Sequence, residues 1–146
     1  MKTYFDLVGE APKENVSVTV SGDWMRVTYD YVKSEPKNDS EGNVVVGDNA
    51  YSAEYIELRG GIRSYDAIAS AIIEDKYPSD KMDAIRLNFE LAQNSAVTSI
   101  SLDDSKREEY IVEYKAMQEW RIHAKEIARK AVEIIDVTYK KKGGIL

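Results

Sequence analysis

The sequence of 146 residues contains no cysteine, only three prolines and two phenylalanines, and a single histidine, His123. The missing cysteine excludes disulfide bonds and thiolate chemistry. With one histidine, a transition-metal site would have to be completed by carboxylates. No apolar run reaches the length of a signal peptide or of a membrane span. We therefore expect a protein that is made and folded in the cytoplasm and does not contact a membrane.

Positive charge is also scarce. The formal net charge is −6, and only residues 104–146 are basic, with 10 lysines and arginines against 8 acidic residues. Binding to nucleic acid therefore has no electrostatic support. The length corresponds to one ordinary domain that can bury a core.

The first 60 residues show the alternation of antiparallel strands. Two runs with a period of two, residues 16–20 and 25–31, flank a Ser-Gly-Asp turn, which predicts a hairpin. In the second run, the alternation places Tyr29 and Tyr31 on one face. Further strands are predicted at 3–8, 44–46 and 53–59, and a solvated loop at 34–43. The expected total is four or five strands.

Two short helices are predicted after Gly60 and Gly61. Ser64 is a suitable N-cap for the first, which should end before Pro78. Its apolar face consists of Tyr65, Ile68, Ala69, Ile72 and Ile73. The Pro-Ser-Asp sequence that begins at Pro78 is a start signal for the second helix. Residues 82–91 also alternate as a strand would, and this alternative stays open, although the start signal and helix propensity favour a helix.

The last third, about residues 104–140, has the period of one long amphipathic helix. Its stripe contains Tyr110, Tyr114, Met117, Arg121, Ala124, Ala128, Ala131, Ile135 and Thr138, and it is flanked by Trp120, Ile127 and Ile134. At its start, Ser105 and Glu108 have the spacing of a capping box. Such a helix would be about 50 Å long, longer than a domain of this size is wide. It should therefore break near Val137 and Thr138, or part of its stripe should face a partner chain.

These patterns together predict an α+β fold. An N-terminal antiparallel sheet in residues 1–60 should be followed, in residues 61–146, by two short helices and one long C-terminal amphipathic helix. We expect sheet and helices to form one compact unit.

Candidates for chemistry are few. His123 lies on the polar side of the long helix, where a solvent-exposed histidine is the simpler interpretation than a general base or metal ligand. Acid pairs such as Asp103 and Asp104 lie in predicted loops or at helix ends, where carboxylates favour solubility and the helix dipole. The Arg-Gly-Gly-Ile-Arg-Ser turn at 59–64 could bind an anion, but Asp66 opposes this and a plain hinge is favoured. We predict no catalytic, cofactor-binding or metal-binding residue.

Ten tyrosines are many for this length. Tyrosine and tryptophan supply contact area at interfaces, although packing beneath a sheet explains most of them equally well. The candidate interface residues are Tyr110, Tyr114, Met117, Trp120 and Arg121. Because Arg121 interrupts the apolar stripe, we expect it to pair with a carboxylate or to stack on an aromatic ring.

Three short motifs between residues 76 and 128 resemble small tail-associated proteins of phages and prophages. They are Asp-Ala-Ile-Arg at 83–86, Glu-Glu-Tyr at 108–110, and Gln118, Trp120 and Arg121 on the long helix. The resemblance implies a non-enzymatic virion or virion-assembly protein. The β-rich N-terminal third differs from tail-fibre assembly chaperones.

The leading hypothesis is thus a phage-derived or prophage-derived structural or assembly protein that acts through protein–protein contacts. Its partners would be further copies of itself or other virion proteins, and it would need no cofactor. The alternative is a small-molecule or carbohydrate-binding module that uses an aromatic sheet face. An enzyme that relies on carboxylates alone ranks last.

Overall fold

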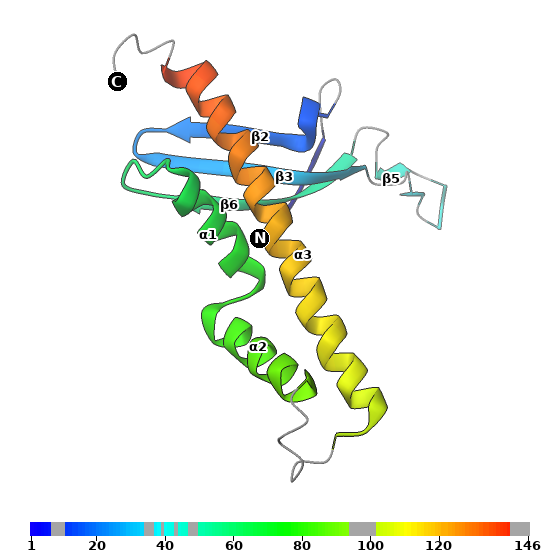
Figure 1. Cartoon of the computed structure of the whole chain (residues 1–146). Helices are drawn as coiled ribbons and strands as arrows, with labels where there is room; N and C mark the ends of the chain where they lie inside the picture. The colour runs from blue at the N-terminus through cyan, green and yellow to red at the C-terminus, as the bar shows by residue number, and fades with distance from the viewer. Residues whose placement is uncertain are drawn as a thin grey trace.

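A computed structural model describes residues 1–6, 11–33, 37–38, 40–42, 44–46, 50–93 and 102–140. It has the predicted α+β fold, with an antiparallel sheet followed by two helices and a long helix that packs on the sheet (Figure 1). The strands of the main sheet are β1 (Lys2–Asp6), β2 (Val16–Ser21), β3 (Trp24–Lys33) and β6 (Ala50–Leu58). The helices are α1 (Tyr65–Lys76), α2 (Ser79–Gln93) and α3 (Asp104–Ile135), and a short 3-10 helix spans Lys13–Asn15.

The main sheet has the order β1-β6-β3-β2, and all of its neighbours are antiparallel. The predicted hairpin is confirmed, since β2 pairs with β3 up to Ser21 and Trp24, and Gly22 has a φ of 62° in the turn. A glycine adopts this left-handed conformation without steric cost. The predicted solvated loop is wrong in part, because β4 (Lys37–Asn38) pairs with β5 (Val44–Val46) in a second, two-stranded sheet. Residues 34–36, 39 and 43 lie outside the described residues.

One face of the main sheet carries the core. Valine and methionine side chains of β2 and β3 pack there with Ile56, Ile68, Ile72 and the alanines of α3. The core cluster consists of Val16, Met25, Val27, Tyr29, Ile56, Ile68, Ala69, Ile72, Ala124, Ile127, Ala128, Ala131 and Ile135. Because these residues come from sheet and helices alike, the burial of apolar area joins the two parts.

A β-bulge interrupts β3. Tyr29 pairs with Glu54, but the next pair is Val32 with Ser52, so β3 has one extra residue. Asp30 lies at this point with a positive φ of 54°. The extra residue shifts the alternation, and Tyr31 contacts Ser17 on the opposite face, with 2.5 Å between their hydroxyl oxygens. The prediction that Tyr29 and Tyr31 share a face is therefore wrong.

Both short helices form as predicted. Ser64 caps α1, because its hydroxyl accepts a hydrogen bond from the backbone N–H of Ala67 at 3.2 Å. In α2, Ile85 is buried while Leu87, two residues further on, is 58% exposed. Strand alternation would have placed both on one face, so burial follows the helical period.

The long helix packs against two different parts of the chain. Its C-terminal half crosses the sheet, and its N-terminal half lies beside α2 beyond the edge of the sheet (Figure 1). Met117 of this half is buried with Tyr77 and Ile85 in a second, smaller cluster. Both halves of the predicted stripe are therefore covered by elements of the same chain, one by the sheet and the other by α2.

Both ends of α3 differ from the prediction in detail. Asp103 is the N-cap, and its carboxylate accepts a hydrogen bond from the backbone N–H of Lys106 at 2.7 Å, so the predicted Ser105 capping box is wrong. At the other end the α-helix stops at Ile135 and continues as a π-helix over Asp136–Lys140, the region where a break was expected.

Among the described residues, no helix is both long enough and apolar enough to cross a lipid bilayer.

Candidate functional site

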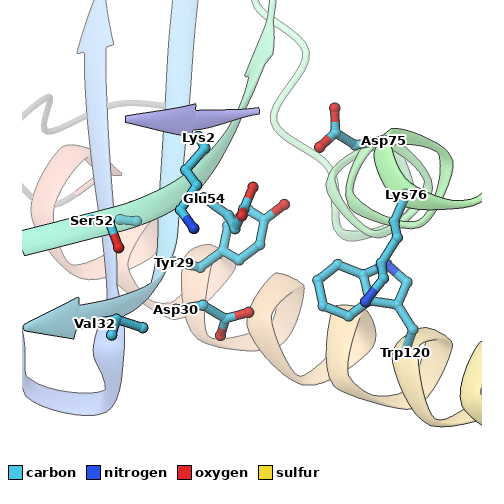
Figure 2. A pocket seen from close by; sticks show the side chains of 10 residues that line it. Lys2, Tyr29, Asp30, Val32, Ser52, Glu54, Asp75, Lys76 and Trp120 are labelled. Atoms are coloured by element: carbon cyan, nitrogen blue, oxygen red, sulfur yellow. The ribbon is translucent and has the colours of Figure 1, made fainter. Parts of the chain in front are cut away.

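A hollow of about 450 Å³ opens between the edge of the sheet, the end of α1 and the middle of α3 (Figure 2). We call it the Tyr29 pocket. Its polar and aromatic lining consists of Lys2, Tyr29, Asp30, Ser52, Glu54, Asp75, Lys76 and Trp120. Such a volume falls within the range of about 300–1,000 Å³ that small-molecule sites occupy.

Tyr29 is the central residue of the pocket. Its side chain is 1% exposed, and its hydroxyl makes no hydrogen bond within the part of the chain that the structure describes. In that same part no buried side-chain oxygen or nitrogen lacks a partner, so the Tyr29 hydroxyl must reach the open space of the pocket. Burial raises the pKa of the phenol, and the nearby carboxylates of Asp75, Glu54 and Asp30 raise it further. The hydroxyl is therefore protonated at neutral pH and can donate a hydrogen bond.

The three carboxylates come from three elements, and each has a partner. Asp30 of β3 lies 2.8 Å from Nε2 of His123, while Glu54 of β6 and Asp75 of α1 both pair with the amino group of Met1, the former at 3.7 Å. Asp30 owes its position to the bulge, whose left-handed conformation aspartate tolerates better than most residues do. Bulges often re-aim a side chain next to a functional site.

Trp120 forms an aromatic wall whose orientation is fixed. Its indole N–H donates to the backbone carbonyl of Ile72 at 3.3 Å, and its ring centroid lies 6.4 Å from that of Tyr29 at an interplanar angle of 49°. The ammonium of Lys76 lies 4.5 Å from the centre of the indole, a cation–π contact. The wall is thus in place before any ligand arrives.

The other candidate interface residues contribute to packing inside the chain. Tyr114 stacks on Phe89 with 3.8 Å between ring centroids, and Met117 is 3% exposed against α2. Tyr110 is half-buried below the ammonium of Lys106. Contact of these residues with a partner chain stays a prediction.

In the described part of the chain, Arg121 does not have the expected carboxylate or aromatic partner. Its guanidinium donates to the side-chain oxygen of Gln118 at 3.1 Å, one helical turn earlier. The side chain is only half-buried, so a neutral acceptor together with solvent is sufficient.

His123 is exposed, as predicted, but it is not isolated, because it joins α3 to the bulge through Asp30. In the residues that the structure describes, no group of three or more histidine or acidic side chains is arranged to hold a metal ion.

The glycine turn at 59–64 connects β6 to α1, and Gly60 and Gly61 have positive φ values of 73° and 75°.

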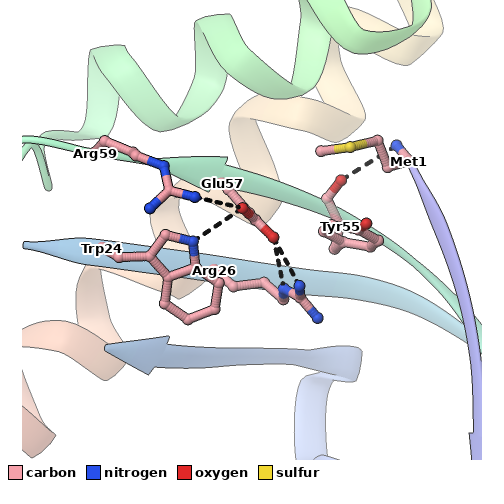
Figure 3. A network of polar contacts seen from close by, with 6 residues as sticks. All are labelled: Met1, Trp24, Arg26, Tyr55, Glu57 and Arg59. Atoms are coloured by element: carbon pink, nitrogen blue, oxygen red, sulfur yellow. Dashed lines mark hydrogen bonds and ion pairs between the residues drawn. The ribbon is translucent and has the colours of Figure 1, made fainter. Parts of the chain in front are cut away.

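A second polar network lies on the face of the sheet that points away from the helices (Figure 3). The carboxylate of Glu57 accepts hydrogen bonds from the indole of Trp24 at 2.9 Å and from the guanidinium of Arg26 at 2.7 Å and 3.2 Å. The guanidinium carbon of Arg26 lies 4.3 Å from the centre of the Tyr55 ring. The hydrogen bond from Trp24, followed by those from Arg26, lowers the pKa of Glu57.

The lowered pKa makes the contribution of Glu57 to stability dependent on pH. It should be complete above the unfolded-state pKa, about 4.3, and should be lost as the pH falls through the lower pKa of the folded state. Urea unfolding of the wild type and Glu57→Gln should therefore show a clear difference at pH 7 that shrinks towards pH 3. A difference that stays constant or grows on acidification would contradict the lowered pKa.

The Tyr29 pocket combines hydrogen-bond donors, acceptors and aromatic walls around one protonated phenol. Groups of this kind recognise polar molecules by shape and hydrogen bonding.

Comparisons of this chain with protein-family models, curated proteins and solved structures found no match.

Proposed function

We propose that this protein is a non-enzymatic binding protein whose Tyr29 pocket receives a small polar molecule or a polar group of a larger partner. The observation that carries the proposal is the hydroxyl of Tyr29, which has no hydrogen-bond partner among the residues that the structure describes, although its side chain is 1% exposed. A group of this kind gains a partner when a ligand enters.

Preorganisation of the pocket supports binding. Asp30 is held by His123 and the indole of Trp120 by Ile72, so these groups lose little freedom when a ligand arrives. The walls belong to strands and helices, which position side chains more accurately than loops do. These features support the small-molecule alternative, with the pocket in place of an aromatic sheet face.

A screen of small neutral, cationic and anionic fragments tests the proposal. The NMR signal of the Trp120 indole N–H should shift for at least one fragment, whereas that of Trp24, on the other face of the sheet, should not. In Tyr29→Phe, which keeps the buried ring, the affinity should fall by about fivefold, because a lost hydrogen bond costs about 1 kcal/mol.

Tyr65→Phe is the matched control, since Tyr65 lies outside the pocket at the start of α1 and is 39% exposed. This variant should bind as the wild type does. If no fragment moves the Trp120 signal, the proposal is wrong.

A second candidate function is a structural or assembly protein of a phage or prophage, which acts through protein–protein contacts. Its support is the resemblance of the three motifs, together with their position in the structure. Asp83–Arg86 belongs to α2, and 108–110 and 118–121 belong to α3, so the motifs lie on the two helices that pack together beyond the sheet.

This second function predicts self-association or a complex with other virion proteins. Light scattering after size-exclusion chromatography measures the first, and the neighbouring genes bear on the second. A strict monomer encoded in a metabolic operon would contradict it, and a position among tail and baseplate genes would support it.

A further inference from the structure

Opposite charges nearly cancel in the lining of the Tyr29 pocket. The lining contains the carboxylates of Asp30, Glu54 and Asp75 and the ammonium groups of Lys2 and Lys76. The amino group of Met1, which lies outside the lining, pairs with Glu54 and Asp75. Neither lysine forms an ion pair within the described residues; Lys2 lies over the ring of Tyr4 and Lys76 over that of Trp120. A ligand with a net charge would therefore leave a charge of the opposite sign without compensation when it displaces water.

We infer that the ligand of the Tyr29 pocket is a neutral, hydroxyl-rich molecule, such as a monosaccharide unit. This inference rests on the proposed binding function and names the chemical class of its ligand. A sugar unit carries no net charge, so it leaves the balance of the pocket unchanged.

The hydrogen-bonding groups of the pocket fit hydroxyl groups. Glu54 and Asp75 only accept hydrogen bonds, Lys2 and Lys76 only donate them, and the Tyr29 hydroxyl is free to do either. A ligand hydroxyl donates once and accepts up to twice, so it can donate to a carboxylate and accept from an ammonium at the same time. A ligand that only donates hydrogen bonds, such as an alkylammonium ion, would pair with the carboxylates alone. A ligand that only accepts them, such as a carboxylate, would pair with the ammonium groups alone.

The apolar part of the lining suits the carbon skeleton of such a ligand. The rings of Tyr29 and Trp120 form two inclined walls (Figure 2). Val32 and Ala53 complete the apolar surface. Aromatic rings offer a flat, rigid contact for the C–H faces of a ring-shaped ligand. Ser52, 8% exposed, adds one more hydroxyl to the lining.

The test compares neutral and charged probes. The probes are the methyl glycosides of glucose, galactose, mannose, rhamnose and N-acetylglucosamine, with n-butylamine and butyrate as the charged counterparts. We expect at least one glycoside to shift the Trp120 indole signal in a saturable way at millimolar concentration, while the Trp24 signal stays in place. Neither charged probe should do so at the same concentration.

Two variants assign the effect to the pocket. Tyr29→Phe should weaken glycoside binding by about fivefold and Glu54→Gln, which loses a charged acceptor, by about tenfold, and Tyr65→Phe should leave it unchanged. Thermal unfolding of each variant verifies that it is folded before the titration.

The possible failures are distinguishable. If butylamine or butyrate shifts the Trp120 signal and no glycoside does, the ligand class is wrong while the binding function stands. If no probe in this panel or in the fragment screen shifts it, both are wrong. Glycoside binding that persists unchanged in Tyr29→Phe and Glu54→Gln would place the sugar elsewhere and overturn the inference.

Discussion

Replacing Trp120 by alanine is expected to lower the free energy of unfolding by about 3 kcal/mol. The indole packs against both hydrophobic clusters, and its N–H donates to Ile72. Removal would leave a cavity where the sheet, α1 and α2 meet on α3, together with an unpaired carbonyl. Urea unfolding followed by circular dichroism measures the change.

Ile122→Ala is the matched control, because Ile122 lies two residues further along the same helix and is 70% exposed. Its effect should stay within about 0.5 kcal/mol. A loss below about 1 kcal/mol for Trp120→Ala would show that the indole contributes little to the fold, and would return it to the role of an interface anchor.

Replacing Ala128 by leucine is expected to cost about 2 kcal/mol or more. Ala124, Ala128 and Ala131 are all 0% exposed where α3 packs into the core, so a larger side chain has no space unless the helix moves away. The same substitution at Ala116, which is exposed on α3, changes helix propensity equally but overpacks nothing.

Thermal or urea unfolding of Ala128→Leu and Ala116→Leu compares the two positions. The second variant should be within about 0.5 kcal/mol of the wild type. Equal stability of both variants would show that the core has room beside α3, contrary to its close packing.

Local patterns predicted most of the fold because each depends on neighbours in the sequence. The helical period placed Ile68, Ile72, Ala124 and Ala128 correctly in the core, and the alternation of valines predicted the hairpin. Ser64 acts as the predicted cap because capping involves only the first turn of a helix.

The Tyr29 pocket could not be predicted in the same way. Its side chains come from β1, β3, β6, α1 and α3, and their meeting depends on strand order and on the angle between helix and sheet. Asp30 appeared as one outward residue of a regular strand, since no residue nearby marks a bulge. The contact between His123 and Asp30 could not be predicted either, because the two residues are 93 positions apart in the sequence.

The long helix shows where a correct pattern led to an open question. Its stripe is real, but the sequence did not specify which surface covers it. Half of the stripe packs on the sheet and half on α2, so the length that pointed to a partner chain is accommodated by the order of elements within the chain.

The bulge in β3 has a consequence for how the pocket relates to the fold. Asp30 lies in the bulge and takes no part in the pairing of β3 with β6, because β6 pairs with Tyr29 before it and with Val32 after it. A chain without this one position could keep both pairings and lose little besides the carboxylate that meets His123. The strand thus carries an inserted functional group, and the acidity of the pocket can be altered without rebuilding the sheet that supports it.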